Sequence, residues 1–469
     1  MRPWLVGLDV GTTSCKAVVM APDGREVAAG RAPTPWTTTA LGTQTDGEAL
    51  VDAARAALSD AVAAAPPGRI LGVGVASMAE SGVLLADDGR AVAPLIAWHD
   101  TRDAAETAAL RAELGAQFSV CTGLPLRQQW SLTKHRWQLD HDEAAATGVR
   151  RLGVAEWIVH ALGGEQVSEL SLASRTGWLD LGRRDWWDEA LAWSGARRSL
   201  LPELVASGEP VGTAHDRWGI PGLGGAALTV AGHDHQAAAV GAGVAGAGDV
   251  LDSHGSAEAV LRTVSAGLAA GQVEALAAAG ITTDLGVRVG NWSLLGGTQG
   301  GLVLRHTLDE LGVVWADLPV LDAAALAADC DAEADSGRAG ADTCRAGGGA
   351  SRAGAGASRA SGGASRAGDD GGRTGPRPAT AGGGAKWRAV IEAETGAAAE
   401  RIATMARIVG PHQRLVVTGG WCASAAVLAA KRRLFGPLVV ADVAEAGTLG
   451  AATLAARAAG ALGPADALA

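Results

Sequence analysis

The residues best suited to chemistry lie near the N-terminus, where Asp9 ends an apolar stretch and a short turn of Gly11, Thr12 and Thr13 follows. A carboxylate at a strand end can hold a metal ion. Glycine and hydroxyl groups let backbone N–H groups approach phosphate oxygens closely. The turn therefore predicts a phosphate-binding site beside an acidic metal ligand.

The segment that follows this turn differs from the segment that follows better-known phosphate-binding loops. A P-loop or a dinucleotide fingerprint opens a helix after its glycines. Here residues 17–20 have the pattern of a second strand, residues 22–24 of a hairpin turn and residues 26–32 of a returning strand. A meander of strands after the turn therefore favours a phosphate-binding site of a different kind from a P-loop or a dinucleotide fingerprint.

The order of acid, glycine and hydroxyl recurs about one domain length later, at Asp252, Gly255 and Ser256. A strand-like run, residues 249–251, precedes this second turn, and residues 259–261 have the pattern of a returning strand. Two halves of similar plan predict a nucleotide held in a cleft between two domains. The alternative is a pair of unrelated turns in a glycine-rich chain.

A second carboxylate, Asp234, follows the strand-like residues 228–230. At a strand end near a phosphate turn, it suits a general base that takes the proton from a substrate hydroxyl attacking a γ-phosphate. One alternative is a metal site using His233 and His235, for which no third ligand stands at helical or hairpin spacing. The other is a helix N-cap role for Asp234.

A third group of residues could bind a sugar. Trp98 offers a ring that stacks on the carbon face of a sugar, and Asp100 and Arg102 offer an acceptor and donors for hydroxyls. Glu80 follows the strand-like residues 72–76 and joins this group if that strand end lines the same cleft. The alternative is a surface salt bridge beside a packed tryptophan, with Glu80 facing solvent.

Two further glycines, Gly419 and Gly420, stand at a strand-to-helix junction. Glycines at such a junction allow a flat ligand such as adenine and ribose to approach the backbone.

Composition limits the class of protein. A chain of 469 residues is long enough for two domains, and a net charge of −11 without a long basic run argues against a nucleic-acid surface. Five cysteines without a C-x-x-C pair favour a reducing compartment. Asp9 interrupts the early apolar stretch, so we expect no leader peptide. No segment reaches the roughly 18 uninterrupted apolar residues of a membrane helix, so we expect no membrane span and a cytoplasmic location.

The elements that must position these residues alternate between strand and helix patterns over residues 1–225, which predicts an α/β domain. We expect a second domain over residues 226–469, opening with the buried-strand run of residues 226–230. The pattern breaks at residues 336–385, which contain no Leu, Ile, Val, Met, Phe or Trp. This predicts a disordered insert; the alternative is an arginine-bearing tail for an acidic partner.

The chain after the insert returns to ordinary patterns. We expect a closing helix from residue 445, whose alanines and glycines permit close backbone packing. Before it, we expect a long helix at 388–408, a strand at 414–418, a helix at 424–434 and a strand at 438–440.

Taken in order, these motifs resemble those of the FGGY family of carbohydrate kinases over nearly the whole chain apart from residues 336–385. Five segments carry the resemblance in the order of the family's motifs: residues 9–16, 98–102, 232–234 and 255–257, and then 418–420 together with 445–452. The resemblance implies two ribonuclease-H-like domains of the actin-type ATPase fold, with ATP and Mg²⁺ in the cleft between them.

The family also implies roles for the residues. Asp9 would position hydrated Mg²⁺, and Asp234 would deprotonate a hydroxyl of a small sugar or polyol. The residues implied to select that substrate are Glu80, Trp98, Asp100 and Arg102. Those implied to contact ATP are Gly11, Thr12, Thr13, Gly255 and Ser256, with Lys16 adding charge near the phosphates and Gly419 and Gly420 near the adenosine.

A second hypothesis is that the chain has the same fold but does not catalyse phosphoryl transfer. It would then be a nucleotide-responsive binding or regulatory protein. Its motivation is the insert, which stands where relatives often carry a Gly-Glu-Arg-x-Pro segment. Intact Asp9 and Asp234 and the group at residues 98–102 favour the kinase. The sequence does not distinguish among ketoses, aldonates and polyols as the substrate. Whether the protein forms a homodimer also stays open at this point.

Overall fold

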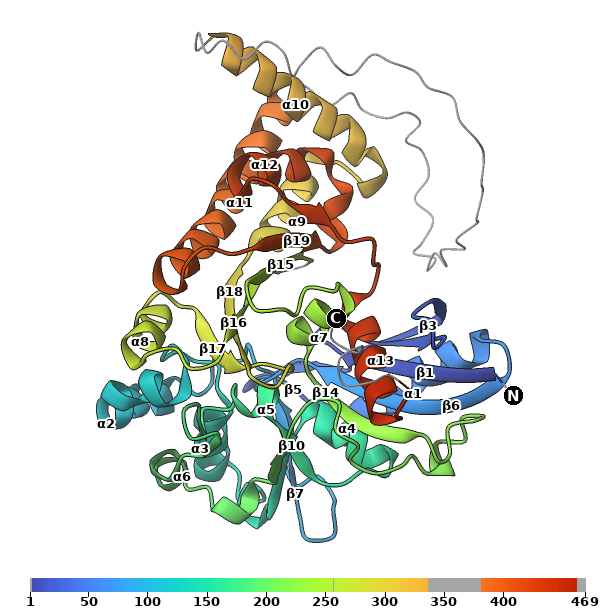
Figure 1. Cartoon of the computed structure of the whole chain (residues 1–469). Helices are drawn as coiled ribbons and strands as arrows, with labels where there is room; N and C mark the ends of the chain where they lie inside the picture. The colour runs from blue at the N-terminus through green and yellow to red at the C-terminus, as the bar shows by residue number, and fades with distance from the viewer. Residues whose placement is uncertain (1, 256, 336–380, 462–469) are drawn as a thin grey trace. The chain divides into compact units, whose positions relative to one another are not determined.

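The computed structural model describes residues 2–255, 257–335 and 381–461 (Figure 1). Ser256 of the second turn, and residues 336–380 of the insert that we expected to be disordered, lie outside these ranges. Residues 381–385 correct that expectation, because they form the start of helix α11 (Ala381–Val409). Its glycines are poor helix formers, but Gly384 lies so close to Ala324 that a Cβ atom there would clash, and this tertiary packing favours the helix.

The chain forms two compact units, which we describe separately. The first contains Met1–Thr298, Ala397–Gly420 and Pro437–Ala469, and the second contains Gln299–Gly396 and Trp421–Gly436. All the candidate site residues belong to the first unit.

The first unit contains a five-stranded sheet, here called the first sheet. Its order is β14 (Ala227–His233), β6 (Gly68–Ser77), β1 (Arg2–Val10), β2 (Ser14–Met20) and β3 (Glu26–Pro33). Strands β1, β2 and β3 form the expected antiparallel meander, whereas β6 and β14 run parallel to β1.

Strand β1 shows why this sheet is covered on both faces. Successive side chains of a strand point to opposite faces. Val6 and Leu8 belong to a cluster that includes residues of α1 (Gly47–Ala64), whereas Leu5 packs with residues of α13 (Ala446–Ala458). The nearly continuous apolar run of β1 therefore fits a strand buried on both sides.

Helix α13 lies very close to the first sheet, as its many small residues predicted. A Cβ atom added at Gly7 would clash with the carbonyl oxygen of Thr448, and one at Gly74 would clash with that of Ala451. On α13 itself, a Cβ atom at Gly450 would clash with the carbonyl oxygen of Ala237 in α7 (Asp234–Gly241). The absence of side chains at these glycines allows the backbones to touch.

A second sheet of six strands also lies in the first unit. Its order is β17 (Thr282–Leu285), β18 (Asn291–Thr298), β16 (Glu258–Ser265), β15 (Asp249–His254), β19 (Arg414–Thr418) and β20 (Val439–Val440). Strands β15, β16 and β18 form a meander, and β19 and β20 run parallel to β15. Leaving β17 aside, the connectivity repeats that of the first sheet, so the prediction of two halves of similar plan is confirmed.

The strand that we expected to open the second domain differs from that expectation. Residues 227–233 form β14, which pairs with β6 at the edge of the first sheet. An apolar run predicts a buried strand but carries no information about its neighbour, because strand pairing depends on tertiary packing. The change from the first sheet to the second therefore comes after residue 233.

The remaining elements of the first unit surround the two sheets. The helices are α2 (Ala104–Thr122), α3 (Ser131–His141), α4 (Val154–Leu162), α5 (Leu170–Ala173), α6 (Asp188–Ser194) and α8 (Ala270–Ala278). The short strands are β4 (Thr37–Thr39), β5 (Gly42–Thr45), β7 (Gly82–Leu85), β8 (Leu95–Ile96), β9 (Arg150–Gly153), β10 (Val167–Glu169), β11 (Leu179–Asp180), β12 (Asp185–Trp186) and β13 (Glu203–Val205).

The second unit is helical in its described part, with α9 (Gly300–Leu311), α10 (Leu318–Asp335), the first part of α11 and α12 (Ala425–Phe435). Trp387 and Trp421 pack in its core. Asp322 accepts hydrogen bonds from Trp387 Nε1 (2.9 Å) and from the backbone N–H of Ala425 (2.8 Å). Among the described helices of the chain, none has the length and apolar composition that crossing a membrane requires.

Candidate active site

Three candidate segments meet at one edge of the first sheet. In the parallel strands β1, β6 and β14, Val10 is paired with Ser77, and Ser77 is paired with His233. The strands therefore end level with one another. The loops that follow carry the first phosphate turn, Glu80 and Asp234. The carboxyl ends of parallel strands are the usual ligand-binding edge of an α/β sheet.

Asp9 lies one residue before the end of β1. Its Oδ1 atom is shielded from solvent and has no hydrogen-bond partner among the described residues. The pKa of this carboxyl group is raised to about 7, mainly by burial and also by the negative charge of Asp234, against the opposing charge of Lys16. Two carboxylates from distant segments are therefore near enough to act on each other.

Lys16 is the pairing partner of Asp9 on the neighbouring strand β2. Its Nζ atom is 2.7 Å from Oε2 of Glu445, the residue that precedes α13. Both side chains are about one-third exposed, at 29% and 33%. The ion pair joins β2 to the start of α13, and its partners lie too far apart in the sequence for a local pattern to indicate it.

The first turn of α13 faces Asp9. A Cβ atom at Gly447 would lie 2.8 Å from Oδ2 of Asp9, so the close approach depends on glycine. The first N–H groups of a helix have no partner within the helix and carry a partial positive charge. This helix start therefore favours negative charge at the edge of the first sheet.

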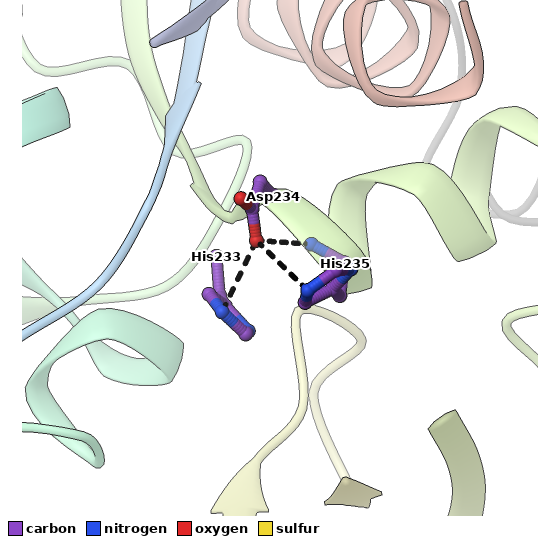
Figure 2. Close-up of side chains that lie close together, drawn as sticks. All are labelled: His233, Asp234 and His235. Atoms are coloured by element: carbon purple, nitrogen blue, oxygen red, sulfur yellow. Dashed lines mark hydrogen bonds and ion pairs between the residues drawn. The ribbon is translucent and has the colours of Figure 1, made fainter. Parts of the chain in front are cut away.

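Asp234 is the first residue of α7, directly after β14. Its Oδ1 atom accepts a hydrogen bond from the backbone N–H of His235 (2.6 Å) and lies 3.1 Å from Nε2 of His233 (Figure 2). The side chain of His233 is 5% exposed and that of Asp234 is 23% exposed. The carboxylate is thus held in one orientation and still reaches solvent.

Glu80 has an unusual backbone at the end of the loop after β6. Its φ is 65°, and Arg184 is the only other described residue, glycine aside, with a positive φ. A left-handed backbone costs about 1–3 kcal/mol outside glycine, and such strain is concentrated at functional sites. The carbonyl of Glu80 accepts a hydrogen bond from Ser131 Oγ (2.5 Å), which helps to hold this conformation.

The carboxylate of Glu80 belongs to a buried network that our sequence analysis missed. Its Oε1 atom accepts hydrogen bonds from Gln129 Nε2 (2.9 Å) and Arg175 Nε (2.8 Å), and Arg175 also pairs with Asp284 on β17 (3.0 Å). Burial raises the pKa of Glu80, and Arg175 opposes that rise. An arginine between two carboxylates far away in sequence has no local signal.

Trp98 connects the expected sugar motif to the phosphate turn. Its Nε1 atom donates a hydrogen bond to Oγ1 of Thr12 (2.8 Å), and Trp36 Nε1 donates one to the carbonyl of Thr12 (2.7 Å). In the same turn, the N–H of Gly11 bonds the carbonyl of Ser14, and Thr13 is exposed. The turn is therefore braced by two tryptophans.

Asp100 and Arg102 bind each other. Arg102 Nε and Nη2 donate to the two oxygens of Asp100 (2.9 and 3.0 Å), and the N–H of Thr43 donates to Asp100 as well (2.5 Å). Burial would raise the pKa of Asp100, but the hydrogen bonds from Arg102 and Thr43 outweigh it and lower that pKa. The pair fastens its loop to β5, and its expected contact with a sugar stays a prediction.

The other candidates meet at the equivalent edge of the second sheet. Ser253 on β15 is paired with Thr418 on β19, so Gly255 and Gly419 follow neighbouring parallel strands. Gly419 has a φ of 101°, and a Cβ atom there would clash with the backbone of His254. Nothing lies within 4 Å of the corresponding position at Gly420. The second phosphate turn and the expected adenosine turn are thus neighbours.

Known proteins resemble both the sequence and the structure. A model of the N-terminal domain of the FGGY family of carbohydrate kinases matches residues 4–241. A xylulose kinase from Streptomyces coelicolor is 32% identical over 246 residues, covering 52% of this chain and 50% of that protein. A glycerol kinase from Thermococcus kodakarensis is 29% identical over 271 residues, covering 56% and 54%.

The chain spans about half the length of these curated relatives. The likeness to a solved structure extends further. The crystal structure of xylulose kinase from Rhodospirillum rubrum matches with a TM-score of 0.76 and 25% identity, covering 99% of this chain and 92% of that one. The expected fold, two ribonuclease-H-like halves of the actin type, is therefore confirmed.

Proposed function

The chain belongs to the FGGY family of carbohydrate kinases, and we propose that it transfers the γ-phosphate of ATP to a hydroxyl group of a small sugar or polyol. The observation that carries this proposal is the meeting of Asp9 and Asp234 at one edge of the first sheet, where the two carboxylates interact. Phosphoryl transfer needs one acidic group for a metal ion and another for the proton of the attacking hydroxyl.

In this proposal Asp234 is the general base. The N–H of His235 and the ring of His233 orient its Oδ1 atom, and its partly exposed position allows a substrate hydroxyl to reach it. The carboxylate would accept the hydroxyl proton as the oxygen attacks the γ-phosphate, which typically contributes about 10²–10⁴-fold to a rate.

Asp9 suits a magnesium ion. Mg²⁺ prefers oxygen ligands and keeps several of its waters, and Oδ1 of Asp9 is an oxygen without a partner among the described residues. When bound, the ion would neutralise charge on the phosphates. Lys16 adds positive charge on the adjacent strand, and Thr12 and Thr13 offer hydroxyl groups beside it.

The substrate side is proposed to be formed by Glu80 and Trp98, with Asp100 and Arg102 holding or contacting the sugar. Glu80 supports this role because Gln129 and Arg175 bond its Oε1 atom, so that Oε2 is the oxygen available to a sugar hydroxyl. Gly255 and Ser256 are proposed to contact the phosphates, and Gly419 and Gly420 the adenosine.

The two sheets support a division of labour between two domains. We propose that the first sheet and its loops bind the sugar and the first phosphate site, and that the second sheet binds the rest of the nucleotide. Because ATP is supplied inside cells, we propose that the protein is cytoplasmic. We also propose that it has no nucleic-acid partner.

The test is ADP production from Mg-ATP across a panel of ketoses, aldonates and polyols, with Asp234→Ala as the silent control. Glu143→Ala, at an exposed acidic position, is the matched variant that should keep full activity. One strongly stimulating substrate would support the proposal and identify the sugar. ATP binding without stimulation by any substrate would favour a non-catalytic nucleotide-binding protein instead.

A further inference from the structure

Three consecutive residues at the edge of the first sheet, His233, Asp234 and His235, point their side chains toward one place (Figure 2). Each offers one ligand atom, and these atoms all lie within 4.8 Å of one another. Oδ1 of Asp234 is 3.1 Å from Nε2 of His233 and 4.0 Å from Nε2 of His235. The third ligand that the spacing alone did not provide is therefore the carboxylate between the two histidines.

The convergence has a local cause. Successive side chains of a strand point to opposite faces, so three neighbours on a strand could not meet. Here β14 ends at His233 and α7 begins at Asp234, and the change of backbone direction brings the three side chains together. The N–H of His233 bonds Ser171 Oγ (2.9 Å), which anchors the end of the strand.

The donor set is that of a transition-metal ion. Two imidazoles and one carboxylate are the protein ligands of many zinc sites that keep a fourth position open. Mg²⁺ prefers oxygen ligands, so the same three side chains are a poor match for the ion that accompanies ATP. The chemistry of the cluster thus differs from that of Asp9.

We propose that His233, Asp234 and His235 bind a divalent transition-metal ion, with Zn²⁺ as the best match, and that the bound ion inhibits the enzyme by occupying the carboxylate of Asp234. Metal binding stands on the geometry of the cluster, whereas the inhibition rests on the proposed function. A carboxylate that coordinates a divalent metal ion is a much weaker base, because the positive charge of the ion opposes its protonation by the attacking hydroxyl.

The movement needed to close the site is small. Zinc ligands at about 2.0–2.2 Å from the ion lie about 3.3 Å from one another in a tetrahedral site. The distance between His233 and Asp234 already fits. The ring of His235 must move inward, and at 36% exposure it has room to turn. The fourth position stays open to water.

The test measures binding directly, with the full chain freed of metal by a chelator. Zn²⁺ is titrated in competition with a chromophoric zinc indicator, and Co²⁺ is followed by its visible absorption. We expect one equivalent of tight binding, weakened at least tenfold in His235→Ala and kept in the matched variant His141→Ala, which alters an exposed histidine on α3. Absent binding, or equal affinity in both variants, would overturn the proposal.

A second arm tests the consequence. With saturating Mg-ATP and the substrate found in the panel, Zn²⁺ should slow the wild type, and excess chelator with added Mg²⁺ should restore its rate. Each variant is compared with its own uninhibited rate, and the inhibition should need at least tenfold more Zn²⁺ in His235→Ala. If no substrate is found, the proposed function fails, but the binding measurement still decides whether the metal site exists. Inhibition of equal strength in His235→Ala would mean that the inhibitory ion binds elsewhere and would overturn the proposed inhibition.

Discussion

The two sheets share one connectivity and differ in what they carry at the edges that hold the candidate residues. Each has a three-strand meander followed by two parallel strands. The edge of the first sheet gathers Asp9, Asp234 and Glu80, which can bind metal, move protons and bond hydroxyl groups. The edge of the second sheet carries glycines, which let a ligand approach the backbone.

The fifth strand shows the difference most clearly. In the first sheet it is β14, with seven residues, six of them buried, and it delivers Asp234 to the edge. In the second sheet it is β20, with two exposed residues, Val439 and Val440. Both are edge strands, but β20 is short and exposed, whereas the strand that delivers Asp234 is longer and almost fully buried. The same connectivity is therefore used in two ways, and the burial of the fifth strand differs between them.

The largest expected effect tests the acidic edge of the first sheet. Asp234→Asn removes the proposed base while keeping the shape of the side chain, so kcat should fall by about 10²–10⁴-fold with little change in nucleotide affinity. Asp9→Asn should instead raise the Mg²⁺ concentration needed for half-maximal rate. Steady-state kinetics at varied Mg²⁺ separates the two, and the same response in both variants would contradict separate roles.

The next effect tests the link between the two sheets. Arg175 joins Glu80 to Asp284 on β17, so Arg175→Met leaves two buried carboxylates without the positive charge that pairs with both of them. Removing one partner from a buried ion pair costs about 3–5 kcal/mol in the free energy of unfolding. The exposed pair of Arg198 and Asp185 provides the control, because Arg198→Ala should cost no more than about 1 kcal/mol. Urea unfolding of both variants measures the difference, and equal losses would mean that the buried network is not a structural link.

A third prediction concerns the glycine edge. Gly419→Ala should lower the free energy of unfolding by about 1–3 kcal/mol, because a Cβ atom there clashes with the backbone of His254 and φ is 101°. Gly420→Ala, at a position with no neighbour within 4 Å, should change stability far less. Thermal unfolding distinguishes the two. A stable Gly419→Ala variant would show that the second edge is looser than the first.

A fourth prediction uses pH. Burial raises the pKa of Glu156 from its ordinary value of 4.5 to about 7, so the folded chain binds a proton that the unfolded chain releases. The free energy of unfolding should therefore fall as the pH rises from about 4.5 to 7. Glu156→Gln should be more stable than the wild type above pH 7, by at most about 3 kcal/mol, and not below pH 4. Urea unfolding at pH 4 and pH 8 tests the sign, and a variant less stable at pH 8 would contradict it.

The smallest expected effect tests the join between the first sheet and the last helix. Lys16 and Glu445 are each about one-third exposed, so Glu445→Gln should change the free energy of unfolding by no more than about 1 kcal/mol. Freed from Glu445, Lys16 should bind ATP phosphates more tightly. Glu445→Gln should therefore have a lower dissociation constant for ATP than the wild type. The double variant Lys16→Met and Glu445→Gln should lose that gain, because the lysine is gone. Unchanged affinity would assign the pair to packing alone.

Much of the fold was predictable because local signals agreed with the final packing. The hairpin at residues 22–24 and the apolar runs of β1, β6 and β19 are patterns that a short window reveals. The small residues of α13 predicted contact between backbones. The candidate segments could be picked out along the chain, since glycine, acid and hydroxyl groups at strand ends are local features.

The rest depended on contacts between distant segments. No window that contains Arg175 shows Glu80 or Asp284, which lie 95 and 109 residues away. Asp100 and Arg102 carry the side chains of a sugar site, yet only the folded chain reveals that they bond each other. The run that forms β14 predicted a strand, but its place in the first sheet followed from packing against β6. The roles of the candidate site residues stay predictions.

The position of α13 also affects how the chain can fold during synthesis. One face of the first sheet is covered by a helix that leaves the ribosome more than 440 residues after β1 begins. At about 5–20 residues per second, that face stays uncovered for roughly 20–90 seconds. For that time, the strands made first expose an apolar surface that their own neighbours cannot cover. The nascent chain must therefore keep this surface out of other apolar contacts until α13 is made.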